Sequence, residues 1–491
     1  MRTKVAFGVG QSAEGIKNIA FSMFVVLYYN QVLGLDPWLA GLATGVALAF
    51  DAVTDPVAGA LSDVTRTRWG RRHPYMVLAA LPLAITFVML FAPPAGLTGW
   101  SLFGWLLLTA VLVRASMTFY YVPHMALGAE LSPDYVERAS LFTYSTFFGF
   151  LGAMCMRVAG PPLFFSGTER EMLEQAAYGP FAATLGAVMA AAILYSAWGT
   201  RDRIPHLPQA GADQRFSFGE TFVGLLGLMR FKSFRALVFG MLLTTFTLGV
   251  EAFMFTYMGI YFWELSSGQL GLLGVPVLIG LIPSFYIVPW LTRRFDKRNA
   301  MVGCVLVLVL ATNVPIVCRL AGVFPENGSP LLLPLLLLFR LIAGLIGPAL
   351  ISIPQSMFAD IGDEVALTDG KRVEGLIFAT RSLITKTTGA LSTMLGGLML
   401  KLVNFPDQAE PGQVAASTLF KLGFTEGPLT AVITLLGVAM YLGYPLTKAR
   451  HDAIRMQLER AKDLPSKPAV DGAVAVRGSV RQTVERVGNP Q

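Results

Sequence analysis

The 491-residue sequence is poor in charged residues, in histidine and in cysteine. Charged side chains make up 14% of it, whereas a soluble domain carries about 25%. No Ser/His/Asp set converges, and the histidines are scattered without the spacing of a metal site. The four histidines are His73, His124, His206 and His451. These shortages exclude a large soluble enzyme and argue against a membrane-embedded one, so we expect no enzyme.

The placement of the cysteines and of the charges argues against a disulfide-bonded, metal-binding or nucleic-acid-binding protein. Cys155, Cys304 and Cys318 lie in apolar segments without disulfide or metal spacing, as small hydrophobic residues do. The net charge of +7 does not indicate nucleic-acid binding, because the cations lie in short loops between apolar runs. We therefore expect no cofactor, no nucleic-acid partner and no metal beyond a possible transported Na⁺.

Long apolar runs are what the sequence has in abundance. Hydrophobic residues make up 54% of the chain, and a bilayer core needs about 20 apolar residues per helix. Runs of that length predict an all-α integral membrane protein with twelve transmembrane helices and no cleaved signal peptide. The spans are expected at residues 10–34, 39–61, 74–93, 101–127, 139–165, 180–199, 235–262, 270–292, 299–319, 331–358, 374–402 and 427–448.

The polar segment 200–234 divides the spans into two halves of six. We expect an N-terminal bundle at 1–199, a cytoplasmic linker at 200–234, a C-terminal bundle at 235–448 and a partly disordered cytoplasmic tail at 449–491. Similar short segments after the second and eighth spans indicate that the halves are related. Basic residues concentrate in the loop at 62–73, the loop at 293–298, the linker and both ends. The positive-inside rule therefore predicts cytoplasmic termini in a multi-pass protein of the plasma, or bacterial inner, membrane.

Two acidic residues lie inside the second span. Asp51 and Asp55 are four residues apart and therefore share one helix face, with Thr54 beside them and Pro56 freeing backbone carbonyls. An ionisable group at this depth costs at least about 2.5 kcal/mol on insertion scales. The two carboxylates either share a proton, jointly ligate a cation such as Na⁺ with Thr54, or pair with basic residues of neighbouring helices.

Other polar residues also lie within predicted spans. Lys386 is too deep to reach the membrane surface easily, so it either balances Asp51 or Asp55 or donates hydrogen bonds to substrate. The remaining ones either line a substrate cavity or make interfacial and interhelical contacts. These residues are Glu14, Lys17, Asn18, Arg114, Tyr121, Glu251 and Arg340.

Charged residues at the predicted cytoplasmic helix ends have two interpretations. They are solvated charges that set topology, or they form salt bridges between the halves that hold a cytoplasmic gate shut when the site faces out. The set comprises Asp63, Arg71, Arg72, Asp296, Arg298, Asp360, Asp363 and Arg372.

Several of these segments together resemble a known family. Asp51-Ala-Val-Thr-Asp55-Pro56 and the following residues to Pro74, Ser356 to Asp360, and Gly370 to Gly375 with Lys386 are similar to signatures of the glycoside–pentoside–hexuronide:cation symporters, the melibiose-permease group. The resemblance extends over about residues 8–445. It implies the major facilitator fold of two six-helix bundles and symport of a sugar-like solute with H⁺, Na⁺ or Li⁺ by alternating access. It also maps the cation site onto Asp51, Thr54 and Asp55, with a coupling or substrate role for Lys386.

The resemblance is weaker where galactoside carriers bind sugar. Tyr121 stands where they have a carboxylate in the fourth helix, and Thr146 where they have an arginine in the fifth. The stretches Tyr120 to Pro123 and Glu137 to Ala139 also resemble animal lysolipid carriers of the same superfamily branch. We therefore expect a functional monomer in the lipid bilayer that carries a sugar, a glycoside or a related small organic solute. A lysolipid or amphiphile is the alternative substrate.

Overall fold

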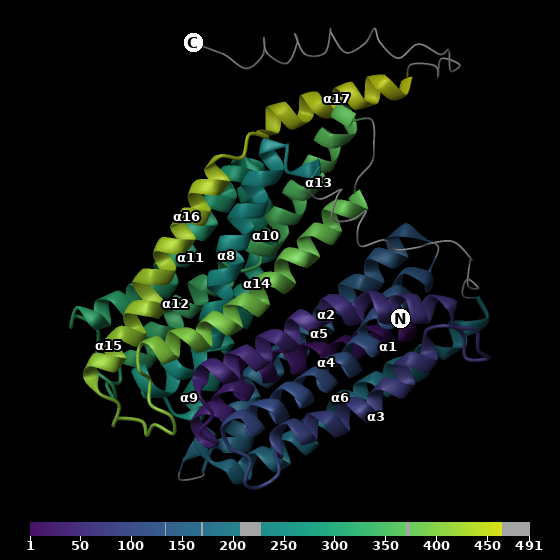
Figure 1. Ribbon diagram of the computed structural model, residues 1–491. Helices are drawn as coiled ribbons and strands as arrows, with labels where there is room; N and C mark the ends of the chain where they lie inside the picture. The colour runs from purple at the N-terminus through teal and green to yellow at the C-terminus, as the bar shows by residue number, and fades with distance from the viewer. Residues whose placement is uncertain (133, 168–169, 207–226, 370–373, 464–491) are drawn as a thin grey trace, which may run out of the picture.

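A computed structural model describes residues 1–132, 134–167, 170–206, 227–369 and 374–463. Every regular element that these residues form is a helix. The helices fall into two groups, purple to blue and teal to yellow in Figure 1. The N-terminal group is formed by α1 (Arg2–Ala20) with the π-helical turns η1 (Phe21–Val25) and η2 (Tyr28–Val32), α2 (Pro37–Val64), α3 (His73–Phe91), α4 (Gly99–Glu130), α5 (Tyr135–Phe165), the short turn η3 (Glu171–Leu173) and α6 (Gln175–Thr200), after which comes η4 (Arg201–His206).

The C-terminal group is likewise built of helices and short helical turns. It consists of α8 (Lys232–Tyr257) with η5 (Met258–Phe262), α9 (Ser267–Leu272), α10 (Val275–Arg294), α11 (Lys297–Leu320), α12 (Leu332–Ile346), α13 (Ala349–Asp369), α14 (Glu374–Leu402), α15 (Ala416–Phe424), η6 (Thr425–Leu429) and α16 (Thr430–Leu442). The chain then continues into α17 (Lys448–Asp463), which covers the first part of the predicted tail. The rest of the predicted tail, from residue 464, lies outside the described residues.

Helix length and composition identify a multi-pass membrane protein. Ten of the described helical segments are long and apolar enough to cross a bilayer. Helices α1 and α14 are not among these ten, although predicted spans coincide with both. The first helix begins at Arg2, earlier than the predicted residue 10. The last apolar membrane segment begins at Ala416, earlier than the predicted residue 427. Both extensions are more polar than the spans they continue, so apolar runs alone could not include them.

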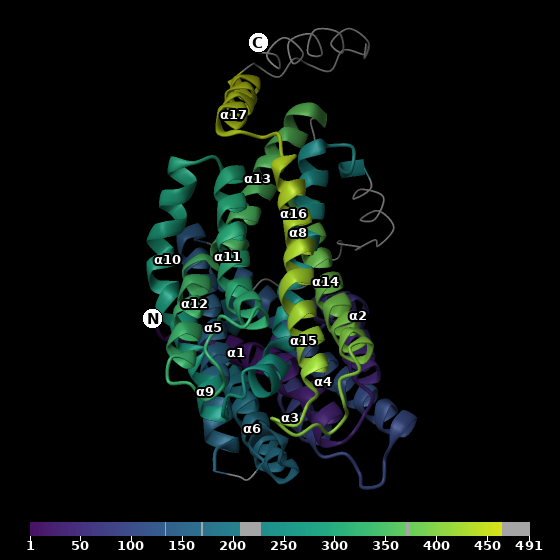
Figure 2. The ribbon, with the colours of Figure 1, turned by 90° about the vertical axis from the view of Figure 1, so that its left-hand side faces the viewer.

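Within each group the helices pack on one another. Helix α1 contacts α5 and α6, and α4 contacts α2 and α3. In the second group α8 contacts α16 and α14, and α10 contacts α12. Three contacts join the groups: α2 lies along α14, α5 lies against α9, and α8 touches the turn η1. Figures 1 and 2 show α2 and α14 side by side.

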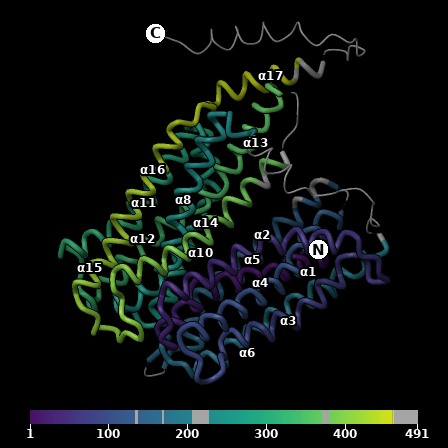
Figure 3. The backbone as a smooth tube through the Cα atoms, in the orientation of Figure 1, coloured from purple at the N-terminus to yellow at the C-terminus, as the bar shows by residue number. Residues whose placement is uncertain are grey.

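The two groups meet at one end and diverge at the other. The backbone trace in Figure 3 separates towards the end that bears the N-terminus and α17. We call this the terminal side and the other the closed side. At the closed side α2 and α14 touch through glycines: a Cβ on Gly397 would lie 2.3 Å from the carbonyl oxygen of Pro37, and one on Gly41 2.7 Å from that of Thr393. Only glycine allows such a close backbone approach.

Hydrogen bonds link the groups at the closed side. Asn30 donates to the Asp407 carboxylate over 2.7 Å and accepts from the Tyr257 hydroxyl over 2.9 Å. The Gln31 side-chain oxygen accepts from the Tyr261 hydroxyl over 2.9 Å. We call these five residues the closed-side network. The side chains of Asn30, Gln31, Tyr257 and Tyr261 are buried and exclude water from this end. Asp407 is exposed at the edge of the network, where partial desolvation raises its pKa above the ordinary value, opposed by the hydrogen bond from Asn30.

Candidate functional site

Asp51 of α2 is held by Arg114 of α4. The guanidinium makes two hydrogen bonds to the carboxylate, at 2.5 Å from Nη2 to Oδ2 and 3.2 Å from Nε to Oδ1. Asp51 is 8% exposed and Arg114 7%. Such fork-to-fork pairing is the strongest geometry available to a carboxylate and an arginine. The pair lies wholly inside the N-terminal group.

Asp55, one turn further along α2, pairs across the two groups. Its Oδ2 accepts from the Lys386 ammonium of α14, and its Oδ1 accepts from the Thr118 hydroxyl over 3.0 Å. The side chains of Asp55 and Lys386 are 26% and 27% exposed, so this pair is far more accessible than the Asp51 pair. The Thr54 hydroxyl meanwhile donates to the Phe50 carbonyl over 3.3 Å.

Both aspartates thus have basic partners in this conformation. This is the arrangement that the sequence left open as the alternative to a shared proton or a bound cation. The two interpretations are compatible, because a carboxylate that gives up Lys386 has a free oxygen for a proton or a metal cation. Asp55 can exchange partners in this way more readily than Asp51, which is buried and doubly bonded.

Polar residues of α1 adjoin the same site. Glu14 accepts from Lys17 over 2.9 Å and from Asn18 over 3.1 Å. Lys17 also interacts electrostatically with Arg114 and Asp51. In the same way Tyr121 of α4 interacts with both Glu14 and Asp55. The structure therefore gathers these predicted cavity residues around the two aspartates, with α1, α2, α4 and α14 contributing.

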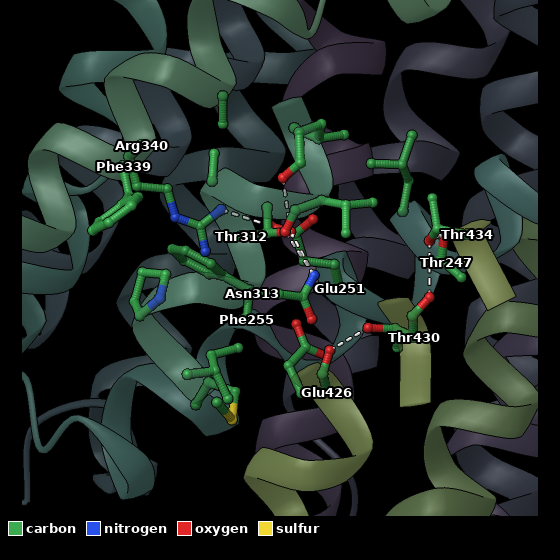
Figure 4. A pocket seen from close by; sticks show the side chains of 18 of the residues that line it. Thr247, Glu251, Phe255, Thr312, Asn313, Phe339, Arg340, Glu426, Thr430 and Thr434 are labelled. Carbon is green, nitrogen blue, oxygen red and sulfur yellow. Dashed lines mark hydrogen bonds and ion pairs between the residues drawn. The ribbon is translucent and has the colours of Figure 1, made fainter. Parts of the chain in front are cut away.

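Glu251 and Arg340, also predicted for the substrate cavity, lie elsewhere. They form an ion pair of 2.7 Å between α8 and α12 inside the C-terminal group. The pair lines a pocket of about 80 Å³, shown in Figure 4. The eight residues predicted for one cavity therefore divide between two places.

The predicted gate residues pair within their own group. Arg72 bonds Asp63 at 2.5 Å and Glu130 at 2.9 Å, and Arg71 also bonds Glu130. This first cluster lies at the terminal side of the N-terminal group.

A second cluster occupies the corresponding place in the C-terminal group. Lys297 bonds Asp360 at 2.7 Å, and the His451 ring nitrogen lies 3.0 Å from Asp363. Asp296 accepts from the backbone of Lys448 over 3.1 Å, and Arg298 donates to its neighbour Asn299. Arg372 lies outside the described residues. Salt bridges between the halves stay a prediction for a conformation in which the terminal side is closed.

Sequence reasoning missed several residues of these sites. Arg157, in an apolar stretch of α5, places its guanidinium carbon 4.0 Å from the centroid of the Phe255 ring. It was visible as a cation inside the predicted span 139–165. Glu426 lies just before the predicted start of the last span and was taken as outside the membrane. Glu130 and Lys297 were recognisable only as partners, which requires the three-dimensional structure.

Comparison with known proteins now identifies the family. The profile described as MFS/sugar transport protein matches residues 6–448. The chain is 26% identical to the isoprimeverose transporter of Lactiplantibacillus pentosus, over 78% of this chain and 77% of that one. It is 24% identical to the sodium-dependent lysophosphatidylcholine symporter 1 of Gallus gallus, over 94% and 89%.

A solved structure supports the fold. A bacterial homolog of the human lysosomal transporter Spinster, in an inward-facing and unoccupied conformation, superposes with a TM-score of 0.62 at 15% identity, covering 93% of this chain and 96% of that one. The chain therefore belongs to the MFS/sugar transport protein family, among the symporters that its motifs resemble, and is a multi-pass membrane transporter, not an enzyme.

Proposed function

We propose that this protein is a cation-coupled symporter that moves a sugar, a glycoside or a related small organic solute together with H⁺ or Na⁺. Asp51, Thr54 and Asp55 form its cation site. The observation that carries the proposal is the Asp55–Lys386 ion pair, which joins the two helix groups and leaves both side chains about a quarter exposed. A site that bridges moving parts can convert cation binding into a change of conformation.

The mechanism follows from competition for Asp55. A proton or Na⁺ at Asp55 displaces the Lys386 ammonium, and the freed ammonium then has donors for solute hydroxyls. Cation binding therefore raises the affinity for solute, and linkage requires that solute raise the affinity for cation by the same factor. Release of both returns Lys386 to Asp55. Asp51 stays held by Arg114, and this pair stays neutral while Asp55 changes partner.

We further propose the topology. Adding α1 and α14 to the ten apolar segments gives twelve spans, with bundles at 1–199 and 235–448, a linker at 200–234 and a tail at 449–491. The terminal side carries the basic loops, so the positive-inside rule places it in the cytoplasm. The conformation described here is then open to the cytoplasm and sealed outside by the closed-side network. The protein acts as a monomer in the plasma, or bacterial inner, membrane.

The substrate has a second candidate. A relative is named for lysophosphatidylcholine, and Tyr121 near Asp55 gives the site an aromatic, less polar wall than a carboxylate would. An amphiphile carrier would bind lysolipid in competition with solute. Inhibition of uptake by lysolipid but not by sugars would favour that candidate over the first.

The test is a solute screen in vesicles. Purified protein is reconstituted, and sugars, glycosides and lysolipids are offered under an imposed proton gradient or, separately, an imposed sodium gradient. We expect one solute class to accumulate above equilibrium under one of the gradients, and to equilibrate only without it. Uptake that is identical with and without either gradient would contradict cation coupling.

A further inference from the structure

The C-terminal group contains a small polar pocket that the proposed cation site does not include. It lies between α8, α11, α12, α16 and the turn η6 and measures about 80 Å³. Pockets for drug-sized ligands measure about 300–1,000 Å³, and a water molecule takes about 30 Å³ in the liquid. The pocket can therefore hold a few water molecules or a small ion, but neither a sugar nor a lipid. Figure 4 shows its polar side chains converging.

Glu426 is the group in this pocket that needs an explanation. The residue is 7% exposed, and its Oε2 is fully buried without a hydrogen-bond partner among the described residues. The Thr430 hydroxyl, which lies beside it, donates to its backbone carbonyl and not to its carboxylate. An unpaired carboxylate at membrane depth is costly and is retained for a partner or a function.

The charged neighbours do not supply that partner. Arg340 of α12 already forms its 2.7 Å ion pair with Glu251 of α8, so one negative charge remains on the pocket if Glu426 is ionised. Arg157 of α5 stacks on the Phe255 ring, which lines the pocket. Within the described part of the chain, neither arginine forms an ion pair with Glu426. The Glu426 carboxylate therefore has no direct cationic partner in this part of the chain.

Asn313 of α11 provides a second unpaired acceptor beside Glu426. Its Oδ1 is likewise buried without a partner, while its amide nitrogen donates to the Val309 carbonyl over 3.0 Å and to the Thr312 hydroxyl over 3.1 Å. Oδ1 lies 3.6 Å from the position of a Cβ on Gly427, the residue after Glu426. Figure 4 shows the amide and the carboxyl group facing each other. Two acceptors thus face each other with no donor between them.

A single hydrogen satisfies both atoms. A protonated carboxyl group is a donor, so it can bond an amide oxygen that an ionised one would repel. The hydroxyls of Thr247, Thr430 and Thr434 donate to backbone carbonyls or to each other, so none of them supplies a hydrogen to the two unpaired acceptors. A single proton between the two acceptors satisfies both of them.

We propose that Glu426 is a proton-binding site, separate from Asp51 and Asp55, in which the carboxyl group donates to Asn313 Oδ1. On binding, a proton from pocket water forms the O–H bond at Glu426; on release it returns to water and leaves the carboxylate. A role of this proton in the transport cycle rests on the proposed symport. The binding itself does not, and it can be tested without a substrate.

The test is infrared difference spectroscopy on the purified full-length protein, exchanged between acidic and alkaline buffer in H₂O and in D₂O. We expect the carbonyl stretching band of a buried protonated carboxylic acid, shifted in D₂O and lost in Glu426→Gln. Asn313→Leu should shift this band, because the hydrogen bond is gone, and Glu426→Asp should move it without removing it. Glu326→Gln, at an exposed glutamate, is the matched control and should leave the band unchanged.

A band that persists in Glu426→Gln, or the absence of any such band in the wild type, would overturn the proposal. The same spectra of Asp55→Asn separate it from the symport mechanism. If Asp55→Asn keeps the band and Glu426→Gln loses it, the proton site stands even where vesicle uptake shows no gradient coupling.

Discussion

At the scale of single residues, three carboxylate–base pairs inside the protein differ in what they can do. Asp51 and Arg114 are both less than a tenth exposed and belong to the same helix group. Asp55 and Lys386 are more exposed and belong to different groups. The first pair therefore fixes the site, and the second can open and close with it. The third pair, Glu251 with Arg340, lies in a separate pocket of the C-terminal group.

Arg114→Gln should destabilise the protein strongly. Removing one partner of a buried ion pair leaves an uncompensated charge on Asp51, which typically costs about 3–5 kcal/mol. A lower thermal unfolding midpoint of the purified protein is the measurement. Arg201→Gln, at a half-exposed arginine, is the control and should change it little.

The double variant Arg114→Gln with Asp51→Asn distinguishes pairing from packing. It removes both charges, so most of the lost stability should return. If the double variant is as unstable as Arg114→Gln alone, the loss comes from packing around Arg114 and the pairing argument is wrong.

At the scale of elements, α2 and α14 form the seam between the groups. Their glycine contacts lie at the closed side, and the Asp55–Lys386 pair lies further along the same two helices. The seam therefore links the geometry of the proposed cation site to the closure of the far end. Side chains larger than hydrogen at Gly41 or Gly397 would separate the helices.

Gly397→Leu should loosen the closed side. Its side chain would collide with the backbone at Pro37, so α14 has to move away from α2. We expect maleimide labelling of Ala40→Cys, a buried position on α2, to become several-fold faster in protein whose native cysteines are replaced by alanine. Gly104→Leu, where an added Cβ meets no atom within 4 Å, is the matched control. Equal labelling in both variants would contradict the seam.

At the scale of the whole molecule, the closed-side network and the diverging terminal side correspond to one conformation of the proposed alternating-access cycle. The network joins residues more than 200 positions apart in the sequence, such as Asn30 with Tyr257 and Asp407. Opening the closed side requires these bonds to break and removes the neighbours that partly desolvate Asp407.

The closed side should therefore respond to pH. In the closed state, partial desolvation raises the pKa of Asp407. Opening returns that pKa to its ordinary range. The closed state therefore binds the proton at Asp407 more tightly. Acidification favours closure, and this stabilisation is lost as the pH rises through the raised pKa. Labelling of Ala40→Cys, corrected for thiol ionisation, should be slower at low pH, and Asp407→Asn should remove that dependence. An unchanged pH dependence in Asp407→Asn would assign the effect to another group.

The sequence predicts the helices better than their partners. Apolar runs located the helices to within a few residues at most ends, and ten of the described segments are long and apolar enough to cross a bilayer. The same argument marked Asp51, Asp55 and Lys386 as unusual. It could not choose Arg114 for Asp51 and Lys386 for Asp55, since that choice depends on how α2, α4 and α14 pack. Glu426 was missed because its helix begins earlier than its apolar run.

The central claim is that Asp55 couples solute movement to a cation. The most direct measurement is the accumulation ratio, in vesicles under an imposed cation gradient, of the solute that the screen identifies, for wild type, Asp55→Asn and Asp51→Asn. Solute exchange at equal concentrations in the same vesicles shows that each variant is folded and mobile. We expect the wild type to accumulate solute, whereas the Asp55→Asn variant should exchange it but only equilibrate it. Concentrative uptake by both variants at the wild-type ratio would contradict cation coupling through Asp55.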